Sequence, residues 1–124
     1  MKLLTHNMLT STIIKGVLKG YPLGITAKKL EIKEAEFNKE FICRMISKVD
    51  WSALYSAVTD VGHPDCIPQT LVEDFESNDE FLKKVHHALM EIEIEEGELI
   101  CPETGRKFTI KNGIPNMLLN EDEV

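Results

Sequence analysis

Residues 81–95, FLKKVHHALMEIEIE, contain the change in hydrophobic period on which the fold depends. In their first part, apolar residues recur every three or four positions, which predicts a helix with one buried face. The apolar residues of this face are Phe81, Leu82, Val85, Ala88, Leu89 and Ile92. From Glu91 to Glu95, glutamate and isoleucine alternate strictly, which is the period of a β-strand. A helix that leads directly into a strand indicates an α+β chain.

Towards the C-terminus, the sequence predicts a meander of short antiparallel strands. Glu96-Gly97 is a turn signal, and Asn112-Gly113 is among the strongest signals for a two-residue hairpin. The expected strands are residues 91–95, 99–101, 106–110 and 114–119, with a further turn at 102–105.

Towards the N-terminus, capping residues mark where helices begin. Asn38 and Asp50 are good N-caps, and each is flanked by apolar residues at the spacing of a hydrophobic staple. Residues 77–80 form a capping box in front of the helix that enters residues 81–95. The sequence therefore predicts three helices between residues 37 and 90.

Residues 1–36 show the least periodicity. Three glycines and a proline between positions 16 and 24 indicate a loop, whereas residues 30–32 alternate like a strand that could pair with the C-terminal meander. We therefore expect two parts. Residues 1–36 and 91–124 form a small antiparallel β domain from both chain ends, and residues 37–90 form an inserted three-helix domain.

The net charge of −7 is unevenly distributed along the 124 residues. Residues 1–48 carry nine Lys and Arg against four Asp and Glu, a balance of +5, whereas residues 49–124 carry five against seventeen, a balance of −12. An acidic surface repels phosphate backbones, which disfavours nonspecific nucleic-acid binding. A basic rim in the N-terminal half could still contact RNA that another protein holds.

Cysteine usage indicates a reducing compartment. Cys43, Cys66 and Cys101 are too few, and odd in number, for a disulfide framework. The first residues lack the apolar core of a signal peptide, and no later stretch approaches eighteen apolar residues. We expect a soluble intracellular protein that does not enter a membrane.

Residues 101–105, CPETG, have the outline of a zinc knuckle. Thr104 stands where the second thiolate of such a knuckle belongs, and no cysteine precedes Cys43 to complete a set of four ligands. We expect a metal-free chain in which Cys101 is a buried strand residue.

Catalysis by this chain alone is not expected. His86 and His87 are adjacent on a helix and about 100° apart, so they cannot face one metal ion. The alternating glutamates of residues 91–95 are expected on a solvated face of a hairpin. The glycines between positions 16 and 24 lack the strand-to-helix setting of a dinucleotide fingerprint. Binding of a nucleotide-type cofactor by this chain is therefore not expected either.

The segment at residues 113–119, GIPNMLL, is apolar and contains Pro115. Proline cannot donate a hydrogen bond to a strand ladder, so a strand that carries it lies at a sheet edge. An apolar edge strand invites aggregation unless something covers it. Either the core of this protein or another chain covers the segment.

Several sequence blocks together resemble the eukaryotic tRNA methyltransferase activator subunit. They are residues 1–7, 36–38, 44–46, 49–51, 101–106 and 113–119, and they extend over the whole chain. The resemblance implies a zinc-ribbon-like β domain with an inserted helical domain. It also implies a non-catalytic subunit that forms 1:1 heterodimers, one at a time, with methyltransferases that modify tRNA, rRNA and a translation termination factor. The partner then binds S-adenosylmethionine, and the pair is expected in the cytoplasm and the nucleus.

The resemblance further implies that an edge of the ribbon domain pairs with a strand of the catalytic subunit. This edge corresponds to residues 113–119 and also to residues 1–7. The implied partner-binding residues are Lys2, Leu3, Leu4, Thr5, Asn7, Gly113, Ile114, Pro115, Asn116, Met117, Leu118 and Leu119. Two rival functions remain open, namely a ribbon module that binds RNA directly and a small hydrolase that uses the glutamate-rich hairpin.

Overall fold

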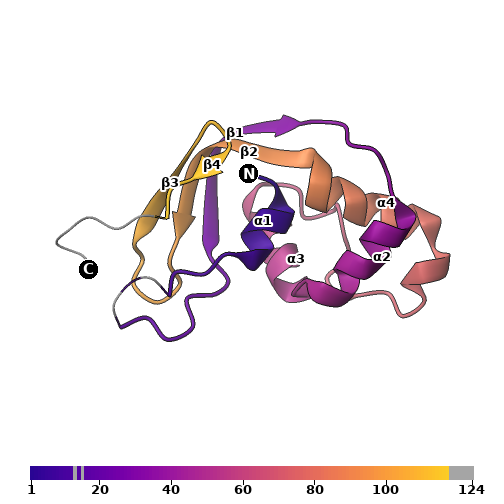
Figure 1. Ribbon diagram of the computed structural model, residues 1–124, viewed down its shortest axis with the longest axis horizontal. Coiled ribbons are helices and arrows are strands. Elements are labelled where there is room, and N and C mark those ends of the chain that lie inside the picture. The colour runs from indigo at the N-terminus through magenta and orange to yellow at the C-terminus, as the bar shows by residue number, and fades with distance from the viewer. Residues whose placement is uncertain (13, 15, 118–124) are drawn as a thin grey trace.

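A computed structural model describes residues 1–117 apart from residues 13 and 15. The main elements in chain order are α1 (Leu3–Met8), β1 (Gly24–Ile32), α2 (Lys39–Lys48), α3 (Trp51–Asp60), α4 (Asp79–His86), β2 (Ile92–Ile100), β3 (Lys107–Lys111) and β4 (Ile114–Pro115). A short 3-10 helix, η1 (Phe75–Ser77), precedes α4, and a π-helical turn, η2 (His87–Glu91), follows it. Figure 1 shows the sheet at one end of the molecule and most of the helices at the other. The predicted α+β class is confirmed.

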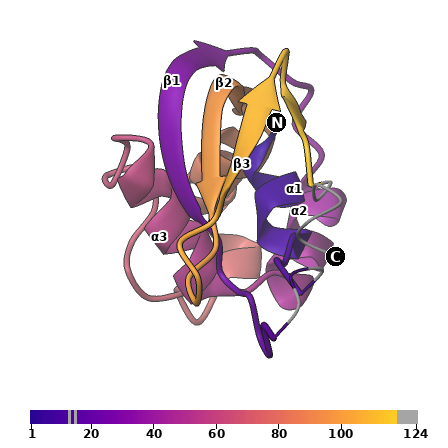
Figure 2. The ribbon, with the colours of Figure 1, turned by 90° about the vertical axis from the view of Figure 1, so that its left-hand side faces the viewer.

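The sheet joins segments that are far apart in the sequence. Its four strands are antiparallel in the order β1-β2-β3-β4, so β2 lies between the N-terminal strand β1 and the C-terminal hairpin (Figure 2). The helices α2 to α4 are inserted between β1 and β2. Both chain ends therefore contribute to one sheet, as the sequence predicts.

The turn predicted at Glu96-Gly97 is wrong, because β2 continues through it as one nine-residue strand. Gly97 pairs with Ala27 on one side and Ile110 on the other. A Cβ atom at position 97 would collide with the Thr26 carbonyl oxygen, beside the irregular register of β1. The glycine thus allows close approach of two strands rather than a change of direction.

The predicted N-caps of α2 and α3 are present. The side-chain oxygen of Asn38 accepts a hydrogen bond from Phe41 N at 3.1 Å, and that of Asp50 accepts one from Ala53 N at 3.1 Å. At α4 the predicted capping box is wrong by one residue. Asn78, not Ser77, is the N-cap and accepts from Phe81 N at 3.1 Å.

The change of period in residues 81–95 corresponds to a joint. α4 ends at His86, the π-helical turn carries the chain to Glu91, and β2 begins at Ile92. The Glu91 carboxylate accepts a hydrogen bond from Ala35 N at 3.1 Å and lies 2.9 Å from His87 Nδ1. Glu91 therefore holds the segment that leads into α2, and is not a solvated strand residue.

The other two glutamates of the alternating segment are also engaged. Lys33 Nζ lies 2.9 Å from a Glu93 carboxylate oxygen and 2.8 Å from one of Glu95. Both carboxylates are mostly covered, so the predicted solvated face is wrong for them. Their pairing with a lysine is typical of an ion-pair network rather than of a catalytic acid and base.

One hydrophobic core is shared by the sheet and the helices. Its fully buried members include Leu3, Ile42, Leu54, Leu82, Leu99 and Phe108, so every main layer contributes. The helix α1, which the sequence did not predict, lies between the sheet and α3 (Figure 1). No helix among the described residues is long and apolar enough to span a membrane.

Candidate functional site

The β3–β4 hairpin carries the predicted binding segment at one edge of the sheet. Asn112 and Gly113 both have positive φ angles, 52° and 74°, as a two-residue type I′ turn requires. Lys111 then pairs with Ile114, and Ile110 with Pro115. The predicted hairpin and the edge position of Pro115 are thus confirmed, and within the described residues no strand pairs with the outer side of β4.

The hairpin exposes some predicted residues and covers others. Ile114 is 70% exposed, and Asn116 is also exposed. Asn116 N donates to Thr109 O at 2.9 Å, which continues the alignment with β3 beyond Pro115. Met117 is half-buried and packs against the core. Leu118 and Leu119 lie outside the described residues.

The structure brings the start of the chain to this hairpin. Met1 O accepts a hydrogen bond from Ile94 N at 2.9 Å, so Met1 lies along β2 just beyond the end of its pairing with β3. Gly113 N donates to Glu95 O at 2.9 Å. A Cβ atom at Gly113 would lie only 3.2 Å from Met1 N, which shows how closely the turn approaches the chain start.

The remaining residues of the N-terminal segment form a helix, so the expectation that they add a strand is wrong for residues 3–7. Leu3 is 0% exposed and belongs to the core. The buried amide of Asn7 donates to Asp50 O at 2.9 Å and accepts from Asp50 N at 3.0 Å, which fixes the joint between α2 and α3. Leu3 and Asn7 therefore support the fold, and neither is available for direct contact.

The accessible side of α1 is a different set of residues. Thr5 is exposed, and Lys2 and Leu4 are half-buried. Met8, which was not among the predicted binding residues, is 56% exposed beside them. Met8 is the last residue of α1. A helix of six residues is too short to show a hydrophobic period in the sequence, so the exposure of Met8 could not be predicted.

Cys101 is buried as predicted, but the prediction that it is a strand residue is wrong, because β2 ends at Ile100 and Cys101 opens the knuckle turn. Ser11 Oγ lies 3.0 Å from its sulfur and donates to it, and Thr104 N donates to the sulfur at 3.4 Å. Burial opposes ionisation, but these hydrogen bonds prevail and lower the pKa of the Cys101 thiol to about 7. The role of Ser11 could not be found from spacing, because ninety residues separate it from Cys101.

A second set of hydrogen bonds joins the segment after Ser11 to the knuckle at residues 101–105. The Glu103 carboxylate accepts hydrogen bonds from Leu18 N, Lys19 N and Gly20 N at 3.3, 3.0 and 2.6 Å. These bonds lower the pKa of Glu103. They also fix the backbone at Leu18, which is 91% exposed.

The groups around Cys101 do not fit a structural zinc ion. Such an ion takes four ligands from cysteine, histidine and carboxylate side chains. Cys101 is instead surrounded by the Ser11 hydroxyl and by peptide groups of the knuckle. Within the part of the chain that the structure describes, no group of three or more potential ligands forms.

Comparisons with known proteins identify the family of this chain. Residues 2–113 match the family described as Trm112p-like protein. The chain is 50% identical to multifunctional methyltransferase subunit TRM112 homolog B of Arabidopsis thaliana over 127 residues, covering 100% of both proteins. It is 48% identical to the TRM112-like protein of Bos taurus, covering 99% of this chain and 98% of the relative. It is 30% identical to TRM112 of Saccharomyces cerevisiae, covering 96% of each.

A solved structure has the same fold. It is a chain of the E. cuniculi Mtq2–Trm112 complex responsible for methylation of the eRF1 translation termination factor. The similarity covers 95% of each chain with a TM-score of 0.54 and 21% identity. The family match and the full-length relatives confirm the resemblance inferred from the sequence blocks, and they show that this chain belongs to the Trm112p-like family.

Proposed function

We propose that the chain is a non-catalytic subunit that activates and stabilises S-adenosylmethionine-dependent methyltransferases acting on tRNA, rRNA and a translation termination factor. The observation that carries this proposal is the edge strand β4, with Pro115 and the exposed Ile114, in a chain whose relatives are named methyltransferase subunits. The chain binds one catalytic subunit at a time as a 1:1 heterodimer, and the catalytic subunit binds the cofactor and the substrate.

Binding combines strand pairing with burial of apolar side chains. The catalytic subunit adds a strand to the outer side of β4, where main-chain hydrogen bonds give affinity and side chains give specificity. The direct contacts come from Lys2, Leu4, Thr5, Ile114, Pro115, Asn116 and Met117, and from Leu118 and Leu119 beyond the described residues. Leu3, Asn7 and Gly113 position this surface from within.

Activation follows from mass action. A protein that binds only the folded enzyme lowers the unfolded population. At a concentration one hundred times Kd, it raises the enzyme's free energy of unfolding by about 2.7 kcal/mol. Covering an apolar surface of the catalytic subunit also suppresses its aggregation. RNA contact by this chain is at most indirect, because lysines on the sheet are interspersed with glutamates, as in the pairing of Lys111 with Glu96.

The test is co-expression of the chain with a candidate methyltransferase. We expect soluble 1:1 complex and methyl transfer only when both chains are present, and no binding of S-adenosylmethionine by the isolated chain in calorimetric titration. Methyl transfer by the isolated chain, or a methyltransferase that is equally soluble and active without it, would contradict the proposal.

We also propose that the chain needs no metal ion and acts in both cytoplasm and nucleus. Hydrogen bonds to Cys101 and Glu103 take the place of a metal crosslink between the knuckle and residues 11–20. Elemental analysis after dialysis against a chelator tests the first point, with stoichiometric zinc as the opposing result. Imaging of the tagged chain in cells tests the second, with exclusion from either compartment as the opposing result.

A further inference from the structure

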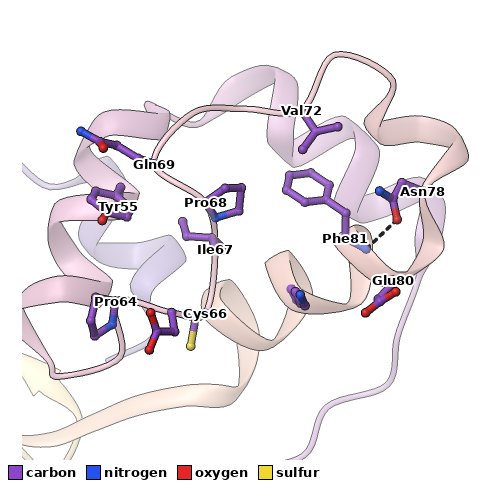
Figure 3. Close-up of a pocket in the computed structure, with 12 residues that line it drawn as sticks. Tyr55, Pro64, Cys66, Ile67, Pro68, Gln69, Val72, Asn78, Glu80 and Phe81 are labelled. Atoms are coloured by element: carbon purple, nitrogen blue, oxygen red, sulfur yellow. Dashed lines mark hydrogen bonds between the residues drawn. The ribbon is translucent and has the colours of Figure 1, made fainter.

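A cleft lies in the helical part of the molecule, away from the β3–β4 hairpin. α3, the loop at residues 64–72 and the start of α4 line an open cleft of about 580 Å³ (Figure 3). Clefts that bind ligands in proteins commonly measure roughly 300–1,000 Å³. The proposed subunit role does not use this cleft, and the chemistry of its lining decides which class of ligand would fit it.

The cleft has an apolar floor. Ile67 and Phe81 are only 3% and 5% exposed and form part of the core. Figure 3 shows Val72 beside the Phe81 ring on one side of the space, with Ile67 and Pro68 across from them. These four residues are the apolar groups that an aliphatic side chain placed there would contact.

The rim of the cleft is acidic. Asp65 and Glu80 are exposed on it, and Lys84 is the only basic residue of the lining. Residues 49–82, which supply all of the lining except Lys84, contain eight Asp and Glu and no Lys or Arg. Of these eight, only Asp79 forms an ion pair within the described residues, with Lys39 at 3.0 Å.

This charge selects the class of ligand. A concentrated negative field attracts basic segments and repels nucleic acid. Because β4 lies at the other end of the molecule (Figure 1), the cleft is separate from the proposed methyltransferase-binding edge. This separation favours a second protein, rather than the catalytic subunit, as the occupant.

We propose that the cleft binds a linear Lys- and Arg-containing segment of a second protein. A central apolar side chain of the segment lies on Ile67 and Phe81, and its basic side chains pair with Asp65 and Glu80. The site goes beyond the subunit role and can be tested on the isolated chain, so failure of one proposal leaves the other intact.

The chain contains its own reporter for this site. Trp51 is the only tryptophan. Its ring centroid lies 5.7 Å from that of Phe81, and its Nε1 donates to Pro68 O at 3.2 Å. Because both neighbours line the cleft, occupation of the cleft changes the surroundings of Trp51 and hence its fluorescence.

The experiment titrates the full chain with a blocked pentapeptide that has a leucine between two pairs of arginines. We expect a saturable change in Trp51 fluorescence that weakens as salt is raised, because salt screens exposed charges. Replacing the leucine by glycine, or the arginines by glutamates, should weaken binding at least tenfold. A linear response to the leucine peptide, or equal binding of the glycine peptide, would overturn the proposal.

Two double variants separate the site from general charge attraction. Asp65→Asn with Glu80→Gln should weaken binding at least tenfold, and circular dichroism should confirm that the variant remains folded. Glu96→Gln with Glu98→Gln makes the same change in net charge on β2 and should bind like the parent. Parental binding by the first variant would overturn the proposal. Loss of peptide binding in the methyltransferase heterodimer would refute the assignment to a second protein.

Discussion

At the scale of single residues, Ile114 is the most exposed large apolar side chain of the β4 edge. It pairs with Lys111 through its backbone, while 70% of its surface remains open to solvent. An exposed isoleucine on an edge strand is a liability for a free protein and an anchor for a complex. The contribution of Ile114 to binding can be measured, because a second exposed isoleucine provides a control.

Replacing Ile114 by Glu should separate the heterodimer. Burying an isoleucine side chain is worth about 1.5–3 kcal/mol, so we expect affinity for a methyltransferase to fall roughly tenfold to one hundredfold. Ile32→Glu is the matched control, because Ile32 is 52% exposed at the end of β1, on the opposite edge of the sheet. Surface plasmon resonance measures both. Equal affinities of the two variants would place the interface elsewhere.

Cys101 should titrate well below an ordinary thiol. Hydrogen bonds from Ser11 and Thr104 overcome its burial and lower its pKa to about 7, whereas burial raises the pKa of Cys66. Carbon-13 Cβ shifts of the two cysteines, followed by NMR against pH, compare them within one sample. A Cys101 midpoint at or above that of Cys66 would contradict the described hydrogen bonds.

The same titration affects stability, with a sign that follows from linkage. Because the folded state lowers the pKa of Cys101 from 9.0, its ionisation stabilises the fold fully above the unfolded pKa and not below the folded one. The free energy of unfolding should therefore rise from pH 7 to pH 9. In Cys101→Ser this rise should be smaller, as measured by urea unfolding at both pH values.

At the scale of elements, β2 is the strand on which the sheet depends, since it pairs with β1, with β3 and with the chain start. At the centre of β2, the strands β1 and β3 must both approach its backbone closely. Gly97 provides that space between Ala27 and Ile110.

Gly97→Ala should destabilise the protein by about 1–3 kcal/mol, because an added methyl group meets the Thr26 backbone, which cannot move aside without disturbing β1. Gly24→Ala is the control within the same sheet. A Cβ there would meet Ile100 Cβ at 3.5 Å, an ordinary contact, so its free energy of unfolding should change by less than about 1 kcal/mol. Urea unfolding of the two variants decides, and equal stabilities would show that β1 can shift.

Local signals explain which elements the sequence could predict. Asn38, Asp50 and Asn112-Gly113 act within a few residues, so the starts of α2 and α3 and the β3–β4 turn were predictable. Long-range contacts explain the errors. Gly97 looks like a turn residue until the neighbouring strand is known, and α1 is a short helix stabilised by the burial of Leu3 and by the contact of Asn7 with Asp50.

In the candidate site, too, local signals could be predicted from the sequence and long-range contacts could not. Pro115 predicted an edge from its own chemistry, and the structure agrees. The accessibility of Leu3, Asn7 and Met8 depends on how α1 packs between the sheet and α3, which no pattern in residues 1–8 encodes.

At the scale of the whole molecule, the two ends of the chain and the helical insert are joined through one core. The proposed binding edge is therefore supported by the same core as the helical insert, and we expect the subunit to act as a preformed template for its partner. A template that binds only the folded partner raises the partner's free energy of unfolding with the logarithm of its free concentration relative to Kd.

A methyltransferase partner should therefore melt at a temperature that rises with the concentration of this chain. At about one hundred times Kd the added stability is about 2.7 kcal/mol, and each further tenfold excess adds about 1.4 kcal/mol. For a catalytic domain of 150–250 residues, 2.7 kcal/mol corresponds to a rise of roughly 5–11 °C in Tm. Differential scanning fluorimetry at increasing subunit concentration measures this dependence. The Ile114→Glu variant should require proportionally higher concentration to reach the same Tm, because it weakens Kd without changing the mechanism. A Tm that is independent of subunit concentration, or a rise that Ile114→Glu leaves intact, would mean that stabilisation does not arise from binding at the β4 edge.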